Sequence, residues 1–198
     1  MENTLALTIT HRYWPRANGL LRDILLIGAG SFLVAALAQV RIPLPFTPVP
    51  LTGQTFAVLL VGAALGSRRG AASLALYLSA GLLGLPVFTG LGSGLAHFAG
   101  PTGGYLLGFI VAAYVVGWLC ERPMPFTANR LDRRWRTALF PFLVGEILIY
   151  LCGLPWLASF IGSDQALAAG LFPFIPGDIV KLLLAALVLP TSWRFIGK

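Results

Sequence analysis

Hydrophobic residues in this chain form long continuous runs, separated by short segments rich in charge, glycine or proline. Six runs stand out, at residues 20–41, 53–67, 70–88, 104–120, 137–160 and 177–196. A helix needs roughly 20 apolar residues to cross about 30 Å of hydrocarbon, and several runs approach or exceed that length. The second run is short for a full crossing. Because the runs are continuous and do not alternate in short segments, helices are favoured over a barrel.

The pattern therefore predicts an all-α, polytopic integral membrane protein with six transmembrane helices. Composition supports this class, since 57% of the residues are hydrophobic, 11% are charged, and the mean hydropathy is +0.83. A soluble domain carries about 25% charged residues. No linker or repeat divides the sequence, so we expect one membrane domain over residues 1–198, with residues 1–19 as a cytoplasmic N-terminal segment.

The net charge of +7 is compatible with a nucleic-acid partner, but the placement of the basic residues indicates a different cause. Most lie in alternate loops: Arg12, Arg16, Arg22, Arg68, Arg69, Arg122, Arg130, Arg133, Arg134, Arg136, Arg194 and Lys198. Excess Lys and Arg mark the cytoplasmic side. We expect both termini in the cytoplasm, residues 42–52, 88–103 and 161–176 outside, and a multi-pass protein of the cytoplasmic (inner) membrane without a signal peptide.

Asp178 and Lys181 lie three residues apart at the start of the last apolar run, so a helix places them on one face. Ionisable residues are expensive within a bilayer and usually serve function there. The pair predicts a ligand site at the outer end, where Lys181 neutralises a ligand carboxylate and Asp178 accepts N–H donors or stabilises Lys181. In the alternative interpretation, Asp178 caps the helix while Lys181 extends to the interface.

Other polar residues near the apolar runs are further candidates. Glu146 lies near the middle of the fifth run, with Tyr150 on the same face. Three roles are open for Glu146: a ligand contact, a proton-carrying group or a partner in a structural hydrogen bond. Thr52, Gln54 and Thr55 offer neutral donors and acceptors at the start of the second run. They follow a segment with four prolines, which favour extended backbone. This segment is either a lid over a pocket or a plain connector.

Residues 100–105 read GPTGGY. We expect the fourth helix to begin at this turn. The first amide N–H groups of the helix would point outward, where they could meet a polar or anionic ligand group. An interfacial turn capped by Thr102 explains the same residues without any ligand.

Four segments together resemble one known family: VPLTGQT at residues 49–55, GLPVF at 84–88, GPTGGY at 100–105 and FIPGDIVK at 174–181. They are similar to the BioY family, the substrate-specificity (S) components of energy-coupling factor (ECF) biotin transporters, in order over roughly residues 20–196. The resemblance implies six helices that bind one biotin near the outer face, with the first outer loop closing over it. It also implies a transmembrane coupling protein and cytoplasmic ATPases as partners. The chain has no phosphate-binding loop of its own.

Biotin combines a ureido ring, an apolar thioether ring and chain, and a carboxylate, and so needs an acceptor, a cation and apolar walls. By this resemblance, Asp178 takes ureido N–H groups and Lys181 the carboxylate, although the reverse arrangement stays open. The family's asparagine before the GPTGG turn has no counterpart in residues 90–94. No metal or cofactor is expected, since biotin is the transported ligand. The predicted substrate-binding residues are Asp178, Lys181, Gln54, Thr52, Thr102, Gly103, Gly104, Tyr105, Glu146, Tyr150 and Phe46.

Two other functions remain open at this point. An S component for a different vitamin would share the same architecture. Ser93 and His97 in the second outer segment resemble the nucleophile and base of an intramembrane serine hydrolase, although no orienting partner is evident. The sequence favours a transport component over an enzyme.

Overall fold

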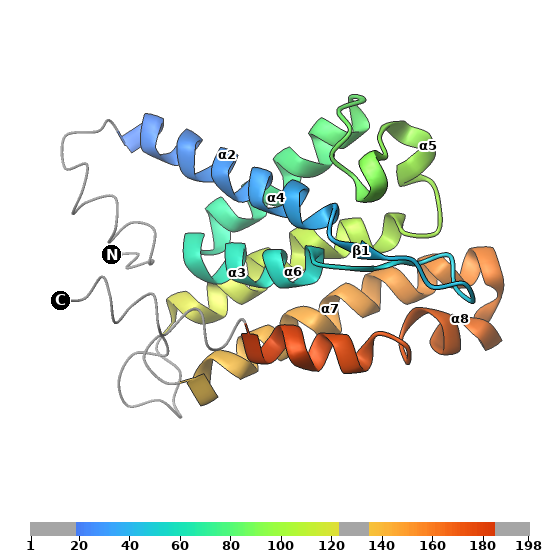
Figure 1. Cartoon of the computed structure of the whole chain (residues 1–198). Helices are drawn as coiled ribbons and strands as arrows, with labels where there is room; N and C mark the ends of the chain where they lie inside the picture. Colours follow the sequence, from blue (N-terminus) through green and yellow to red (C-terminus); the bar gives the residue numbers. More distant parts are fainter. Residues whose placement is uncertain (1–18, 123–134, 185–198) are drawn as a thin grey trace.

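The computed structural model of the chain describes residues 19–122 and 135–184, including side chains from residue 139 onward in the second range (Figure 1). Three predictions concern residues outside these ranges. They are the cytoplasmic segment before residue 19, the basic residues of 123–134, and the end of the sixth apolar run beyond residue 184.

The described part is mostly helical, which confirms the all-α class. Its helices are α2 (Gly19–Ala38), α3 (Gln54–Leu65), α4 (Ser67–Leu82), α5 (Gly94–Phe98), α6 (Gly103–Glu121), α7 (Trp135–Ile161), α8 (Ser163–Gly170) and the C-terminal helix (Ile175–Leu184). A single 3-10 turn, η1 (Thr89–Leu91), and two short strands, β1 (Arg41–Ile42) and β2 (Leu51–Thr52), lie in the connections.

Three described helices are long and apolar enough to cross a membrane: Gly19–Ala38, Gly103–Glu121 and Leu139–Ile161. Helix α8 and the C-terminal helix would add a fourth span if taken together, with a bend of 46° between them. Helices α3 and α4 have 12 and 16 residues, shorter than a straight crossing needs. Residues 163–170, expected in an outer loop, instead form α8.

Helix α6 is central, with contacts to α3, α4 and α7, while α2 packs on α3 and α4 (Figure 1). Small residues allow the helices to approach closely. A Cβ atom added to Gly62 of α3 would lie 2.7 Å from the carbonyl oxygen of Ala113 in α6. This close packing holds the elements that border the site.

The predicted extended loop forms a narrow two-stranded ribbon, in which Arg41 pairs with Thr52 and Ile42 with Leu51. Leu51 packs on the C-terminal helix, since a Cβ added to Gly177 would lie 3.1 Å from its Cδ1 atom. The ribbon, α5 and α8 gather at one end of the bundle (Figure 1). Connections from distant parts of the sequence thus meet at this end.

Candidate ligand-binding site

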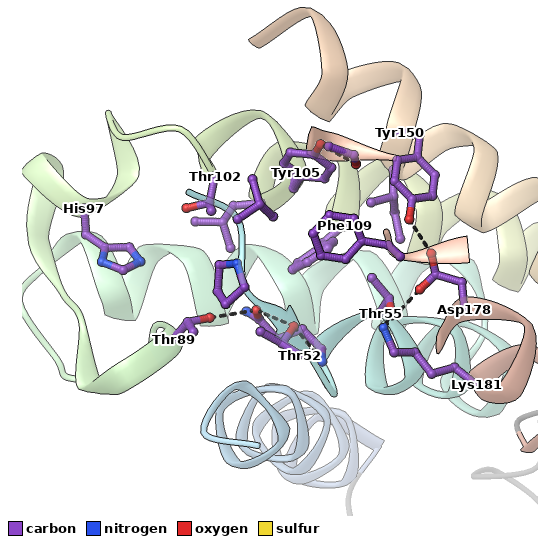
Figure 2. Close-up of a pocket in the computed structure, with 17 residues that line it drawn as sticks. Thr52, Thr55, Thr89, His97, Thr102, Tyr105, Phe109, Tyr150, Asp178 and Lys181 are labelled. Atoms are coloured by element: carbon purple, nitrogen blue, oxygen red, sulfur yellow. Dashed lines mark hydrogen bonds and ion pairs between the residues drawn. The ribbon is translucent and has the colours of Figure 1, made fainter. Parts of the chain in front are cut away.

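A cavity of about 590 Å³, counting open space at its mouth, lies between the helices and the ribbon. Its lining comes from the ribbon, α3, η1, α5, α6, α7, α8 and the C-terminal helix (Figure 2). The lining residues are Val49, Pro50, Thr52, Gln54, Thr55, Thr89, His97, Thr102, Tyr105, Leu106, Phe109, Ile149, Tyr150, Gly170, Phe174, Asp178 and Lys181.

One end of the cavity holds an ion pair. Lys181 Nζ lies 3.0 Å from Asp178 Oδ1 and donates a second hydrogen bond, 3.1 Å long, to the hydroxyl oxygen of Thr55. The hydroxyl of Tyr150 donates to the other carboxylate oxygen, Asp178 Oδ2. Asp178 is only 6% exposed. The pair is therefore buried, hydrogen-bonded and neutral in sum, which limits its desolvation cost.

The alternative interpretation of Asp178 as a helix cap is wrong. The C-terminal helix begins at Ile175, and Asp178 N–H donates to Phe174 O at 2.8 Å within its first turn. Pro176 suits this first turn, where a missing N–H costs nothing. Lys181 does not extend to the interface, since its side chain is 15% exposed and is directed toward α3.

Gln54 organises a second, uncharged group of polar residues. Its amide Nε2 donates to the hydroxyl oxygen of Tyr77 at 2.8 Å, and its Oε1 accepts from Thr52 at 3.1 Å and from Thr89 at 2.9 Å. The side chain is buried, with 4% exposure. Because one buried amide joins β2, α4 and η1, these segments hold a fixed relative position beside the cavity.

The walls between these polar groups are apolar and aromatic. Leu106, Phe109 and Ile149 are all buried and line the cavity. The Tyr105 and Tyr150 rings meet edge to face, with centroids 6.2 Å apart. Tyr105 donates from its hydroxyl to the carbonyl oxygen of Gly170 at 3.0 Å, which ties α6 to α8. Such a mixture of apolar walls and few polar groups is typical of a small-molecule pocket.

His97 lies at the end of the cavity away from the ion pair (Figure 2). Its ring stacks on Phe88, with centroids 5.2 Å apart and planes inclined by 22°. Burial lowers the pKa of the imidazole below its ordinary value. In the empty protein the side chain is therefore neutral at pH 7 and offers one N–H donor.

Seven of the predicted binding residues line the cavity: Asp178, Lys181, Gln54, Thr52, Thr102, Tyr105 and Tyr150. Four do not, and their placement has physical reasons. Phe46 is 64% exposed, at the outer turn of the ribbon. Gly103 and Gly104 are buried where α6 meets α7, and a Cβ on Gly104 would lie 2.6 Å from the Cys152 carbonyl oxygen. Their role is close helix packing.

Glu146 is also outside the cavity lining. It is 4% exposed, and its carboxylate lies next to the side chain of Thr55. It lies within electrostatic reach of Asp178 and Lys181. Glu146 is therefore buried near the ion pair and is not among the residues that line the cavity.

Sequence reasoning missed several lining residues. Thr89 is a single threonine in a connecting segment, and Leu106, Phe109 and Ile149 are ordinary members of apolar helices. The sequence analysis considered His97 only as a catalytic base. The usable signal for Thr89 was its position directly after the GLPVF segment, which is one of the four family segments.

Comparison with known proteins gives a consistent picture. A family model described as the BioY family matches residues 5–198. The chain is 37% identical over 167 residues to a probable biotin transporter BioY from Pyrococcus horikoshii, covering 84% of this chain and 93% of the relative. It is 39% identical over 185 residues to the biotin transporter BioY of Rhodobacter capsulatus, covering 88% and 94%.

One solved structure shares the fold. It is the crystal structure of the S-component for biotin from an ECF-type ABC transporter, with a TM-score of 0.77 and 27% sequence identity. The match covers 88% of this chain and 92% of that one.

Proposed function

The chain belongs to the BioY family, and on this premise we propose that it binds biotin and mediates its uptake as the S component of an ECF-type transporter. The relatives are biotin transporters by name, and the solved structure is a biotin S-component. The observation that carries the proposal is the cavity itself, because its polar groups and apolar walls match the chemistry of this ligand.

The chemistry of biotin matches the lining. Its ureido ring offers two N–H donors and one carbonyl acceptor, and Asp178 and Lys181 present an acceptor and a donor side by side at 3.0 Å. Its thioether ring and valeryl chain are apolar, as are Leu106, Phe109 and Ile149. Apolar walls with a few convergent polar groups are what small-molecule sites usually present. The ribbon residues Val49 and Pro50 cover one side of it.

We also propose six membrane crossings in a single domain, with both termini in the cytoplasm and the cavity opening outward. The alternation of basic segments supports this orientation. The bent pair of α8 and the C-terminal helix, which together are long and apolar enough for one span, supports the last of these crossings. The proposed location is the cytoplasmic membrane.

Uptake requires energy from partners. The sequence contains no Gly-x-x-x-x-Gly-Lys-Ser/Thr phosphate loop, so ATP hydrolysis by that route belongs to other subunits. We propose a transmembrane coupling protein and cytoplasmic ATPases as these partners, since the solved relative comes from an ECF-type ABC transporter. Biotin is cargo in this scheme, and no cofactor is required.

The hydrolase interpretation has no geometric support. The His97 ring lies on Phe88, and within the described ranges no hydrogen bond joins it to Ser93. The family assignment likewise indicates a transport component and not an enzyme.

The test is a calorimetric titration of the detergent-purified chain alone with biotin, followed by competition with thiamine and riboflavin. We expect saturable binding of one biotin that neither competitor displaces. Absence of biotin binding by the folded chain would refute the proposal, and displacement by another vitamin would favour the second S-component hypothesis.

A further inference from the structure

The two ends of the cavity differ in charge. Among the lining residues, Asp178 is the sole carboxylate, and it lies at the same end as Lys181. Glu146 is buried near this end, within electrostatic reach of both. A ligand carboxylate placed here would meet one cation, Lys181, already paired with Asp178 at 3.0 Å. The end with the ion pair is therefore poorly suited to an additional anion.

The same end is well suited to a neutral group with adjacent donors and acceptors. Asp178 already accepts from Tyr150 and Lys181, yet a carboxylate has about four lone-pair sites in all. It can accept ureido N–H groups while Lys181 donates to the ureido carbonyl. Neither contact requires the ion pair to separate.

The opposite end offers donors without a carboxylate. The hydroxyls of Thr89 and Thr52 donate their hydrogen bonds to Gln54. They can therefore offer only acceptor oxygens to a ligand in the cavity. Thr102 makes no capping hydrogen bond with its side chain, so its hydroxyl is available. His97 supplies a ring N–H, or two when protonated.

The His97 ring is held in place. It stacks on Phe88, which is fully buried, and its other contact is Gly92, where a Cβ atom would overlap the imidazole. Phe88 in turn meets Tyr77 edge to face at 5.6 Å. Because the imidazole is fixed between Phe88 and Gly92, its donors keep a constant direction relative to the cavity.

We propose that His97, with Thr102, contacts the carboxylate of bound biotin, so that the ureido ring lies against Asp178 and Lys181 and the protonation of His97 tunes the preference for the free acid. This inference rests on the proposed function, and it chooses between the two orientations that the sequence leaves open. His97 is then a specificity-determining residue, distinguishing the free acid from its neutral amide.

The surroundings of His97 give the direction of the pH effect. The titratable groups on the elements around it are Arg41, whose guanidinium lies against Gly90, Tyr77 behind Phe88, and Tyr105 on α6. Asp178 and Lys181 lie at the far end of the cavity (Figure 2). Burial, and no neighbouring charge, lowers the pKa of His97. An anion beside the ring favours the charged form, so biotin should bind more tightly as pH falls.

The experiment measures the affinity of the purified chain for biotin and for biotinamide, at about pH 5.5 and pH 8. A carboxylic acid with an ordinary pKa near 4.3 remains ionised at both values. We expect His97→Ala to lower the affinity for biotin at the lower pH by about tenfold or more, as for a lost hydrogen bond to a charged group. The loss of affinity should be smaller at pH 8. Biotinamide should bind His97→Ala and the wild type equally.

Three variants keep the test decisive. His97→Gln retains a neutral donor, so it should bind biotin as the wild type does at pH 8 and lose the pH dependence. Lys181→Ala should lower the affinity for biotin and for biotinamide equally. Leu95→Ala, at an exposed position of α5, serves as the matched control and should change neither affinity.

Two results would overturn the inference. One is an equal effect of His97→Ala on both ligands, or no effect on either. The other is a Lys181→Ala protein that loses only its preference for the free acid, which would place the carboxylate at the ion pair. A wild-type chain that binds neither ligand would instead refute the proposed function, so the two failures are distinguishable.

Discussion

The two polar groups of the cavity are built in opposite ways. Asp178 and Lys181 come from one helix, three residues apart, and carry full charges. Gln54, Thr89 and His97 come from three separate segments and are neutral. A charge in an apolar helix is visible in the sequence because it is costly there. A threonine or glutamine in a connection is ordinary, and only tertiary structure gives it a role.

The two groups should also respond differently to mutation. Removing one partner of a buried ion pair leaves an uncompensated charge, whereas removing one neutral side chain loses hydrogen bonds of about 1 kcal/mol each. Five predictions test or sharpen this contrast, beginning with the largest expected effect.

Lys181→Ala should weaken biotin binding by about 2–5 kcal/mol, because it removes a ligand contact and leaves the buried Asp178 unpaired. Titration calorimetry measures the loss. Arg69→Ala is the matched control, since Arg69 pairs with Asp23 at 2.9 Å and lies outside the cavity lining. Equal affinity of the Lys181→Ala protein and the wild type would contradict the role of the pair.

The double variant Asp178→Asn with Lys181→Met sharpens the same point. It removes both charges together, so thermal stability of the empty protein should recover relative to Lys181→Ala. Biotin binding should not recover. If stability does not return, desolvation of the remaining charge is not the main cost of the single substitution.

Gln54→Ala should cost about 1–3 kcal/mol in biotin affinity, because Thr52, Thr89 and Tyr77 all lose a buried partner. Affinity and melting temperature should fall together, since the same residue fixes the cavity wall. The exposed Gln165 on α8 provides the control substitution Gln165→Ala. An effect larger than that of Lys181→Ala would reverse the predicted order of the two groups.

Tyr150→Phe should weaken binding by about 1 kcal/mol, since the ring stays and only the hydrogen bond to Asp178 is lost. Tyr114→Phe, which alters a half-exposed tyrosine of α6, should have no measurable effect on affinity. A Tyr150→Phe protein with unchanged biotin affinity would show that the hydroxyl does not position Asp178.

Phe46→Ala should change biotin affinity by less than about twofold, since exposed substitutions away from a site have small effects. Phe46 is 64% exposed, although the sequence analysis predicted that it binds biotin. A loss of tenfold or more in the purified protein would restore the original prediction and show that the ribbon closes further onto the ligand.

The sequence was sufficient for the helical class and for the charged group, because hydrophobic run length and an i, i+3 ion pair are local signals. It was insufficient for the neutral group. Thr89 meets Gln54 only after η1 folds back over α3, 35 residues apart in sequence. The glycines at 103 and 104 were predicted at the ligand, whereas their lack of a side chain serves the contact with α7.

The cover formed by the ribbon also affects the strength of the ion pair. Leu51 packs against Gly177, the residue before Asp178, and Val49 and Pro50 line the same cavity. Water admitted beneath these residues would raise the local dielectric constant from about 20 toward 80 and reduce the attraction between the charges roughly fourfold. By keeping water away from Asp178 and Lys181, the ribbon therefore preserves the attraction between the two charges.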